Sequence, residues 1–132
     1  MVPKLLVIDD DRAITDMFEL TMPHEGFEVF TANSGSEGVE AVRKFEPDVL
    51  VVDLMMPGMD GWQVCQEVRT FSQVPILILS AVVDSQKVAR ALDAGADDYL
   101  VKPAPEGALV SRLKRLVRQA RINLHDDSEN DS

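Results

Sequence analysis

Apolar and polar residues follow each other along the chain in two different rhythms. Short runs rich in Val, Ile and Leu are typical of buried strands, and we predict five of them: "KLLVI", "FEVFT", "PDVLVV", "VPILIL" and "DYLV". The segments that follow these runs repeat apolar residues every three or four positions, which indicates amphipathic helices: residues 12–22, 35–45, 61–71, 85–94 and 105–121. This alternation predicts an α/β fold with a parallel sheet.

The apolar strands are continuous, which indicates a sheet covered by helices on both faces. We therefore predict a doubly wound, flavodoxin-like (βα)5 fold whose five parallel strands lie in the order 2-1-3-4-5. A chain of 132 residues suits one such domain, which we expect over residues 1–121. Residues 122–132 lack periodicity and are rich in acids, so we predict an acidic, disordered tail there.

The overall charge limits the classes of partner. A formal net charge of -10 at pH 7 disfavours electrostatic binding of nucleic acid or of an anionic membrane by this domain. We expect proteins or small ions as partners. The single cysteine, Cys65, has no internal disulfide partner, and we predict that it is a small buried apolar residue. The chain has neither a charged-then-apolar leader nor a long apolar run, so we expect a cytoplasmic protein.

Polar residues follow four of the five predicted strands. The carboxyl ends of parallel strands meet at one edge of a sheet, with a ligand crevice outside the first and third strands. The second strand ends only in Ala32, Asn33 and Ser34. Taken singly, an aspartate that caps a helix or a solvated lysine is the ordinary interpretation, but together these residues favour a functional site. The polar residues at the strand ends are Asp9, Asp10, Asp53, Ser80 and Lys102.

Carboxylates that converge at one edge of the sheet repel each other, so their negative charge must be compensated. Two of them about 4 Å apart repel by roughly 1 kcal/mol in water and by about 4 kcal/mol in a partly buried site. Either some are protonated or a cation neutralises them, and a divalent cation is the better explanation. The available ligands are hard oxygens, which suit Mg²⁺ completed by water and a phosphate. Lys102 and the hydroxyl of Ser80 could then hold the anion.

These residues stand in motifs that resemble the receiver domains of two-component response regulators. The resemblance covers about residues 4–121 and is carried by "VIDDD", "VVDLMMPGMDG", "LILSA" and "GADDYLVKP" in this order. It implies that Asp53 accepts a phosphoryl group from the phosphohistidine of a histidine kinase or phosphotransfer protein. It also implies a signalling switch and not a turnover enzyme, because the domain would catalyse only its own phosphorylation and slow dephosphorylation.

The resemblance also implies roles for the other site residues. Lys102 would pair with the acceptor carboxylate and then with the phosphoryl oxygens. Ser80 would turn inward to hold the phosphate, next to Ala81, which is small enough to leave it room, and Tyr99 would move from an exposed to a buried position. Asp10 would bind Mg²⁺ directly and Asp9 directly or through water. The implied magnesium ligands are Asp9, Asp10, Asp53 and the backbone carbonyl of Met55.

Two apolar residues bear on the lifetime of the phosphorylated form. In this family, the side chains two positions after the acceptor and two after the hydroxyl residue often influence how water attacks the aspartyl phosphate. Here they are Met55 and Val82, which cannot orient or polarise a water molecule. We therefore predict slow self-hydrolysis. The peptide bond between Lys102 and Pro103 could be cis or trans.

The resemblance further points to a surface. In many transcription-factor receivers, the fourth helix, fifth strand and fifth helix mediate dimerisation. Ala104 and Ala108 stand where those relatives often carry an aromatic residue and an acid, so a homodimer and a merely solvated face both remain open. The corresponding residues here carry charges of both signs: Lys87, Arg90, Asp93, Asp97, Asp98, Arg112 and Arg115.

Two other functions also remain open. Asp9 and Asp11 form a D-x-D after the first predicted strand, as in haloacid-dehalogenase-like phosphatases, which also pass through an aspartyl phosphate. The other alternative is a receiver-like scaffold that binds partners without being phosphorylated. A stable phosphoryl adduct on Asp53 would favour the switch, whereas an adduct on Asp9 would favour the phosphatase.

Overall fold

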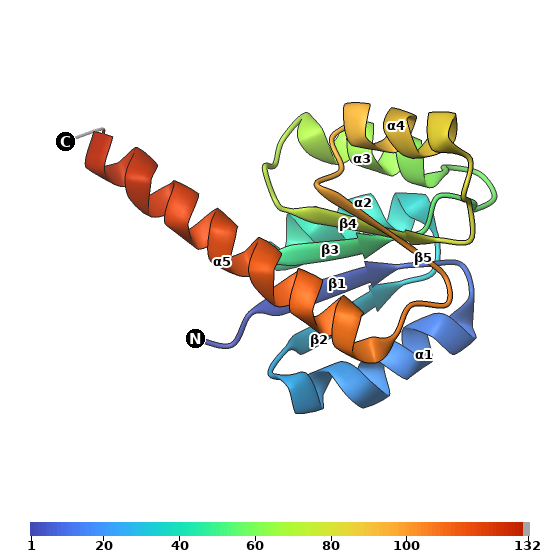
Figure 1. Cartoon of the computed structure of the whole chain (residues 1–132), viewed down its shortest axis with the longest axis horizontal. Coiled ribbons are helices and arrows are strands. Elements are labelled where there is room, and N and C mark those ends of the chain that lie inside the picture. The colour runs from blue at the N-terminus through green and yellow to red at the C-terminus, as the bar shows by residue number, and fades with distance from the viewer. Residues whose placement is uncertain (131–132) are drawn as a thin grey trace.

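The structure is a computed structural model that describes residues 1–130. Its centre is a five-stranded parallel sheet in the order β2-β1-β3-β4-β5, which confirms the predicted fold (Figure 1). The strands are β1 (Lys4–Ile8), β2 (Glu28–Ala32), β3 (Val49–Val52), β4 (Ile76–Ser80) and β5 (Asp98–Val101). The helices are α1 (Arg12–Thr21), α2 (Gly35–Phe45), α3 (Gly61–Arg69), α4 (Ser85–Asp93) and α5 (Glu106–Asn130), with a 3-10 turn, η1 (Met22–Glu25), after α1.

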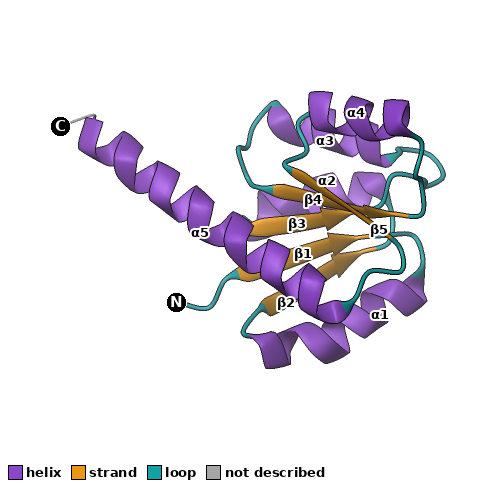
Figure 2. Ribbon diagram, viewed as in Figure 1, coloured by secondary structure: helices purple, strands orange, loops and turns teal. Residues whose placement is uncertain are grey.

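Helices cover both faces of the sheet (Figure 2). Successive residues of a strand point to opposite faces, so Leu6 and Ile8 of β1 pack in one hydrophobic core while Leu5 and Val7 pack in the other. The first core is shared with α2, α3 and α4, and the second with α1 and α5. Cys65 is fully buried in the first core, as predicted.

The helices begin at residues that satisfy their free backbone N–H groups. The side chain of Asp11 accepts a hydrogen bond from the N–H of Ala13 and so caps α1, as the sequence indicated. The helix ends at Thr21, one residue earlier than predicted, and Pro23 lies in the following turn because it has no N–H with which to continue the ladder. The first four helices have side-chain caps, at Asp11, Ser34, Asp60 and Asp84.

The last helix is longer than predicted. We expected it to end at residue 121, but α5 continues to Asn130 and extends past the edge of the sheet (Figure 1). The chain contains neither glycine nor proline after Gly107, so no residue type that breaks helices intervenes. This corrects the helix boundary. The division into a domain and a disordered tail stays a prediction, and its last part, 131–132, lies outside the described residues.

Candidate functional site

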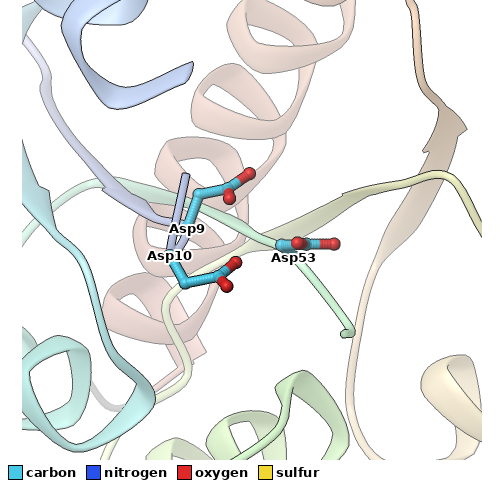
Figure 3. A group of neighbouring side chains, drawn as sticks. All are labelled: Asp9, Asp10 and Asp53. Atoms are coloured by element: carbon cyan, nitrogen blue, oxygen red, sulfur yellow. The ribbon is translucent and has the colours of Figure 1, made fainter. Parts of the chain in front are cut away.

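The strand register brings three carboxylates together at the carboxyl edge of the sheet. Ile8 pairs with Val52, and the N–H of Asp53 donates to the carbonyl of Ile8 at 3.0 Å, so Asp53 lies beside the turn that follows β1. One oxygen from each of Asp9, Asp10 and Asp53 lies within 4.8 Å of the others (Figure 3). Asp9 and Asp53 are buried, whereas Asp10 is exposed.

Both carboxylate oxygens of Asp9 already have protein partners. Its Oδ1 accepts from the N–H of Asp11 at 2.9 Å, and its Oδ2 accepts from Nζ of Lys102 at 2.7 Å. The ammonium group of Lys102 is also 3.5 Å from Oδ2 of Asp53. Burial lowers the pKa of Lys102, but the hydrogen bond to Asp9 and the charges of Asp9 and Asp53 raise it more, so the net shift is upward. The lysine is therefore a firmly held cation.

Asp53 carries charge that its surroundings only partly compensate. Burial raises the pKa of its carboxyl group, and repulsion from Asp9 raises it further. The charge of Lys102, the hydroxyl of Ser80 and a backbone hydrogen bond at Met55 lower the pKa by less than those two effects raise it. The neighbourhood of Asp53 thus has an excess of negative charge, and this favours binding of a cation.

Ser80 and Tyr99 lie next to this cluster. Ser80 is fully buried at the end of β4, and its hydroxyl accepts from the N–H of Val82 at 3.4 Å. Tyr99 of β5 is half-buried, with its hydroxyl donating to the carbonyl of Val82. Burial raises the pKa of Tyr99. The tyrosine thus lies against the loop after Ser80.

The remaining predicted site residues surround the cluster. Ala81 is exposed beside Ser80, and the side chain of Met55, in the loop that follows Asp53, is 58% exposed. The peptide bond between Lys102 and Pro103 is cis, which answers a question that the sequence left open. Every residue that the sequence assigned to the site therefore lies in or beside one cluster at the carboxyl edge of the sheet.

The sequence did not single out Asn33, which the structure places against the acidic turn. Its side-chain amide donates to the carbonyl of Asp9 at 2.9 Å and to Oγ1 of Thr15 at 3.0 Å. The available signal was a polar residue at the end of the strand next to β1. That signal was weak, because Asn is also common in ordinary turns.

The face formed by α4, β5 and α5 carries internal ion pairs. Arg112 donates to both carboxylate oxygens of Asp98 at 2.8 Å. Arg69 of α3 donates to Asp97 at 3.0 Å. The two aspartates that the sequence placed on a possible dimer surface thus have partners within the chain. Within residues 1–130, every helix is too short or too polar to span a bilayer.

Comparisons with known proteins agree with this geometry. Residues 5–114 match the family described as response regulator receiver domain. The transcriptional regulatory protein AfsQ1 of Streptomyces coelicolor is 42% identical over 127 residues, which cover 96% of this chain and 56% of the relative. The DNA-binding response regulator MtrA of Mycobacterium tuberculosis is 39% identical over 127 residues, which cover 96% of this chain and 54% of the relative. The chain thus spans about half the length of these relatives.

Solved structures show the same architecture. The receiver domain of the Francisella response regulator 1452 superimposes with a TM-score of 0.84 at 32% identity, over 89% of this chain and 98% of that one. The Vibrio cholerae chemotaxis protein CheY4 gives a TM-score of 0.83 at 34% identity, over 88% and 99% of the two chains. Similarity therefore extends over most of the described chain in both sequence and fold.

Proposed function

This chain belongs to the family of response regulator receiver domains, and we propose that it is a switch in which Asp53 is the phosphoacceptor. One observation carries the assignment: Asp53 lies in a cluster with two further carboxylates, within 4.8 Å, and with the ammonium group of Lys102 at 3.5 Å. Such a cluster, with a bound cation, provides an anionic nucleophile together with the positive groups that a transferred phosphoryl group requires. The donor would be the phosphohistidine of a histidine kinase or of a phosphotransfer protein.

The acidic cluster fits Mg²⁺. Its donors are hard oxygens, and Asp53 has uncompensated charge. The exposed carboxylate of Asp10, Asp53 and the backbone carbonyl of Met55 would hold the ion directly. Asp9 would act through water, because both of its oxygens accept hydrogen bonds from the protein. When bound, the ion would neutralise charge on the phosphoryl oxygens during transfer.

Three side chains, those of Asp53, Lys102 and Ser80, would act directly in the transfer of the phosphoryl group. A carboxylate oxygen of Asp53 forms the new bond to phosphorus while the bond from phosphorus to the histidine nitrogen of the donor breaks. Lys102 and the hydroxyl of Ser80 donate hydrogen bonds to the phosphoryl oxygens, so charge is stabilised without reorganisation of water. A contact of Ser80 with the phosphoryl group, together with burial of Tyr99 behind Ser80, would favour one state of the face formed by α4, β5 and α5 and so control a partner or an output domain.

An adduct-mapping experiment tests this proposal. The protein is incubated with acetyl phosphate and Mg²⁺, and the phosphorylated residue is located by mass spectrometry after borohydride reduction. We expect the adduct on Asp53, its loss in Asp53→Asn, and its retention in Asp16→Asn, which removes an exposed acid on α1. An adduct on Asp9 would support the phosphatase alternative, and a protein that takes up no phosphoryl group would support the scaffold.

The contacts of Asp11 favour the switch over the phosphatase. Its Oδ1 accepts from the N–H of Ala13 and caps α1, and its own N–H donates to Asp9. The second carboxylate of the D-x-D is therefore engaged in local structure, whereas a phosphatase of that class would need it for catalysis.

We also propose that the protein acts in the cytoplasm.

A phosphorylation-dependent homodimer through the face of α4, β5 and α5 is a further part of the proposal. Exposed apolar side chains on this face, Leu92 and Val101, support it. The internal pair between Asp98 and Arg112 limits it, because these charges are already compensated. Sedimentation at tens of micromolar protein decides the matter: equal coefficients for the bare and beryllofluoride-bound forms would contradict dimerisation.

A further inference from the structure

The end of β2 is bonded to the turn that carries the acidic residues. Both hydrogens of the Asn33 amide are used: one bond goes to the carbonyl of Asp9 at 2.9 Å and one to Oγ1 of Thr15 at 3.0 Å. We propose that Asn33 is a positioning residue for the Mg²⁺-binding carboxylate of Asp10. This inference rests on the proposed function, because it deepens the account of the same acidic cluster.

The end of β2 holds the backbone of Asp9 at two points, its N–H and its carbonyl. The N–H of Asp9 donates to the carbonyl of Ala32 at 3.1 Å, the last backbone bond between β1 and β2. Beyond that point the carbonyl of Asp9 meets the side chain of Asn33, because the backbone of β2 leaves the sheet to enter α2. Asn33 therefore extends the contact between the two strands by one residue, at the position where the acidic turn begins.

The bond to the Asp9 carbonyl bears directly on Asp10. This carbonyl belongs to the planar peptide unit that joins the two residues, so its direction fixes the plane from which the Cα–Cβ bond of Asp10 departs. Among the described residues, the carboxylate of Asp10 accepts no hydrogen bond, and its side chain is exposed. The backbone therefore sets where the side chain of Asp10 starts, and the amide of Asn33 restrains that backbone together with the bond from the N–H of Asp9 to Ala32.

Thr15 orients the amide in turn. Its side chain is 2% exposed, and its hydroxyl donates to the carbonyl of Arg12 at 3.2 Å while accepting from Asn33. One hydrogen of Asn33 is thereby fixed to the first turns of α1, which leaves the other pointing at Asp9. The amide links β2, the acidic turn and α1 in a defined geometry, and this is the role that supporting residues have around metal ligands.

A purely structural role predicts a different result from a positioning role. If Asn33 only stabilises the fold, its removal lowers the free energy of unfolding and leaves the affinity of the folded protein for Mg²⁺ unchanged. If Asn33 positions Asp10, its removal lowers the affinity of the folded protein for Mg²⁺. Ser34 offers a matched control, since its side chain accepts from the N–H of Glu37 at 3.2 Å and caps α2 without a bond to the acidic turn.

The experiment is a titration of the full chain with Mg²⁺ alone, followed through the backbone amide NMR signals of Asp10 and Asp11. We compare the wild type with Asn33→Ala, Thr15→Val and Ser34→Ala. The expected dissociation constant rises about tenfold in Asn33→Ala, less in Thr15→Val, and stays at the wild-type value in Ser34→Ala. The rate of phosphorylation by acetyl phosphate should fall in Asn33→Ala at low Mg²⁺ and recover toward the wild-type rate at saturating Mg²⁺.

Two results would overturn the inference while leaving the proposed function intact. One is a wild-type dissociation constant in Asn33→Ala. The other is an equal rise in Ser34→Ala, which would tie the loss of affinity to general destabilisation. If Asn33→Ala does not fold, Asn33→Ser and Thr15→Val are compared with Ser34→Ala by the same criterion. A wild-type protein that neither binds Mg²⁺ nor accepts a phosphoryl group would instead contradict the proposed function, and the inference with it.

Discussion

The ammonium group of Lys102 lies closer to Asp9, at 2.7 Å, than to Asp53, at 3.5 Å. The single positive charge of Lys102 therefore lies beside two buried carboxylates. The third carboxylate of the cluster, that of Asp10, is exposed. The charges of the three acids exceed that of the lysine, and this difference is what a divalent ion would compensate. Lys102 and a Mg²⁺ ion bound in the same cluster should therefore repel each other.

We expect Lys102→Met to bind Mg²⁺ more tightly than the wild type while accepting phosphoryl groups more slowly. Two unit charges 4 Å apart in a partly buried site interact by about 4 kcal/mol, and water and side-chain movement reduce this. A gain of about tenfold in affinity, or ~1.4 kcal/mol, is a reasonable expectation. Titration with Mg²⁺ measures it. Lys102→Arg keeps the charge and should show no gain, and tighter binding in both variants would contradict the electrostatic explanation.

Replacement of Asp53 should change the dependence of stability on pH. Burial, followed by repulsion from Asp9, raises the pKa of Asp53 above its ordinary value of 3.8. The folded protein then holds this proton more tightly than the unfolded chain does, so the stability contributed by the protonated group is present below pH 3.8 and is lost as the pH rises through the folded-state pKa. Ionised Asp53 therefore lowers the free energy of unfolding at neutral pH.

Asp53→Asn should therefore unfold at higher urea concentration than the wild type at pH 7, and its advantage should shrink as the pH falls toward 4. Urea unfolding at several pH values measures the difference in the free energy of unfolding. Asp16→Asn also removes one negative charge, but from an exposed position on α1. An equal gain in that variant would assign the effect to net charge and not to the burial of Asp53.

Much of the site could be predicted from the sequence because parallel strands end at a common edge. Once five strands were recognised, the residues after them, such as Asp53 and Lys102, had to meet in one region. The order of the strands does not say which carboxylate a long lysine side chain reaches first, because Asp9 and Asp53 follow neighbouring strands. The shorter distance to Asp9 depends on side-chain geometry that only the structure contains.

Two other features were beyond the reach of pattern analysis. Asn33 acts through a side-chain bond to a backbone carbonyl, and whether this bond forms depends on the angle at which the chain leaves β2. The apolar periodicity fades after residue 121 and so predicts that the last helix ends there, yet α5 continues to Asn130. Periodicity reports the burial of a face, whereas helix length also depends on local propensity and on the absence of breaking residues.

The lifetime of the phosphorylated form should depend on two apolar side chains. Met55, in the loop that follows Asp53, is 58% exposed, and Val82 is half-buried beside Ser80. Neither can orient a water molecule, so the double variant Met55→Asn with Val82→Glu should lose its phosphoryl group faster. We expect a gain of roughly tenfold, below the ~10²–10⁴ that a well-positioned general base contributes. The decay of labelled phosphoprotein after removal of the donor measures it.

Val83→Glu is the control for this variant. It introduces the same charge one residue later, at a side chain that is 72% exposed. Because the added carboxylate would project into solvent, the decay rate should stay at the wild-type value. An unaltered rate in the double variant would contradict the assignment of slow hydrolysis to Met55 and Val82.

The single tryptophan, Trp62, should report movement of α4. Its indole N–H donates to the carbonyl of Lys87 at 3.2 Å, and the guanidinium of Arg90 lies 4.7 Å from the ring centroid. Among the residues of α4, only Ala91 is buried, so this helix is held by few contacts and can shift at low cost. Trp62→Phe removes this hydrogen bond, a loss of about 1 kcal/mol in the free energy of unfolding, and also leaves space where the buried indole was. Relative to the wild type, amide exchange should speed up more in α4 than in α1.

Activation should change the fluorescence of Trp62 if the switch acts through α4. Beryllofluoride with Mg²⁺ would occupy the phosphoryl position on Asp53, and a shift of α4 would move Lys87 and Arg90 away from the indole. We then expect emission at longer wavelength, because water replaces the lost contacts, and we expect no change in Asp53→Asn. NMR signals of Lys102 verify that beryllofluoride has bound. Bound beryllofluoride with unaltered emission would show that α4 keeps its place on α3, and the output of the switch would then have to leave through another face.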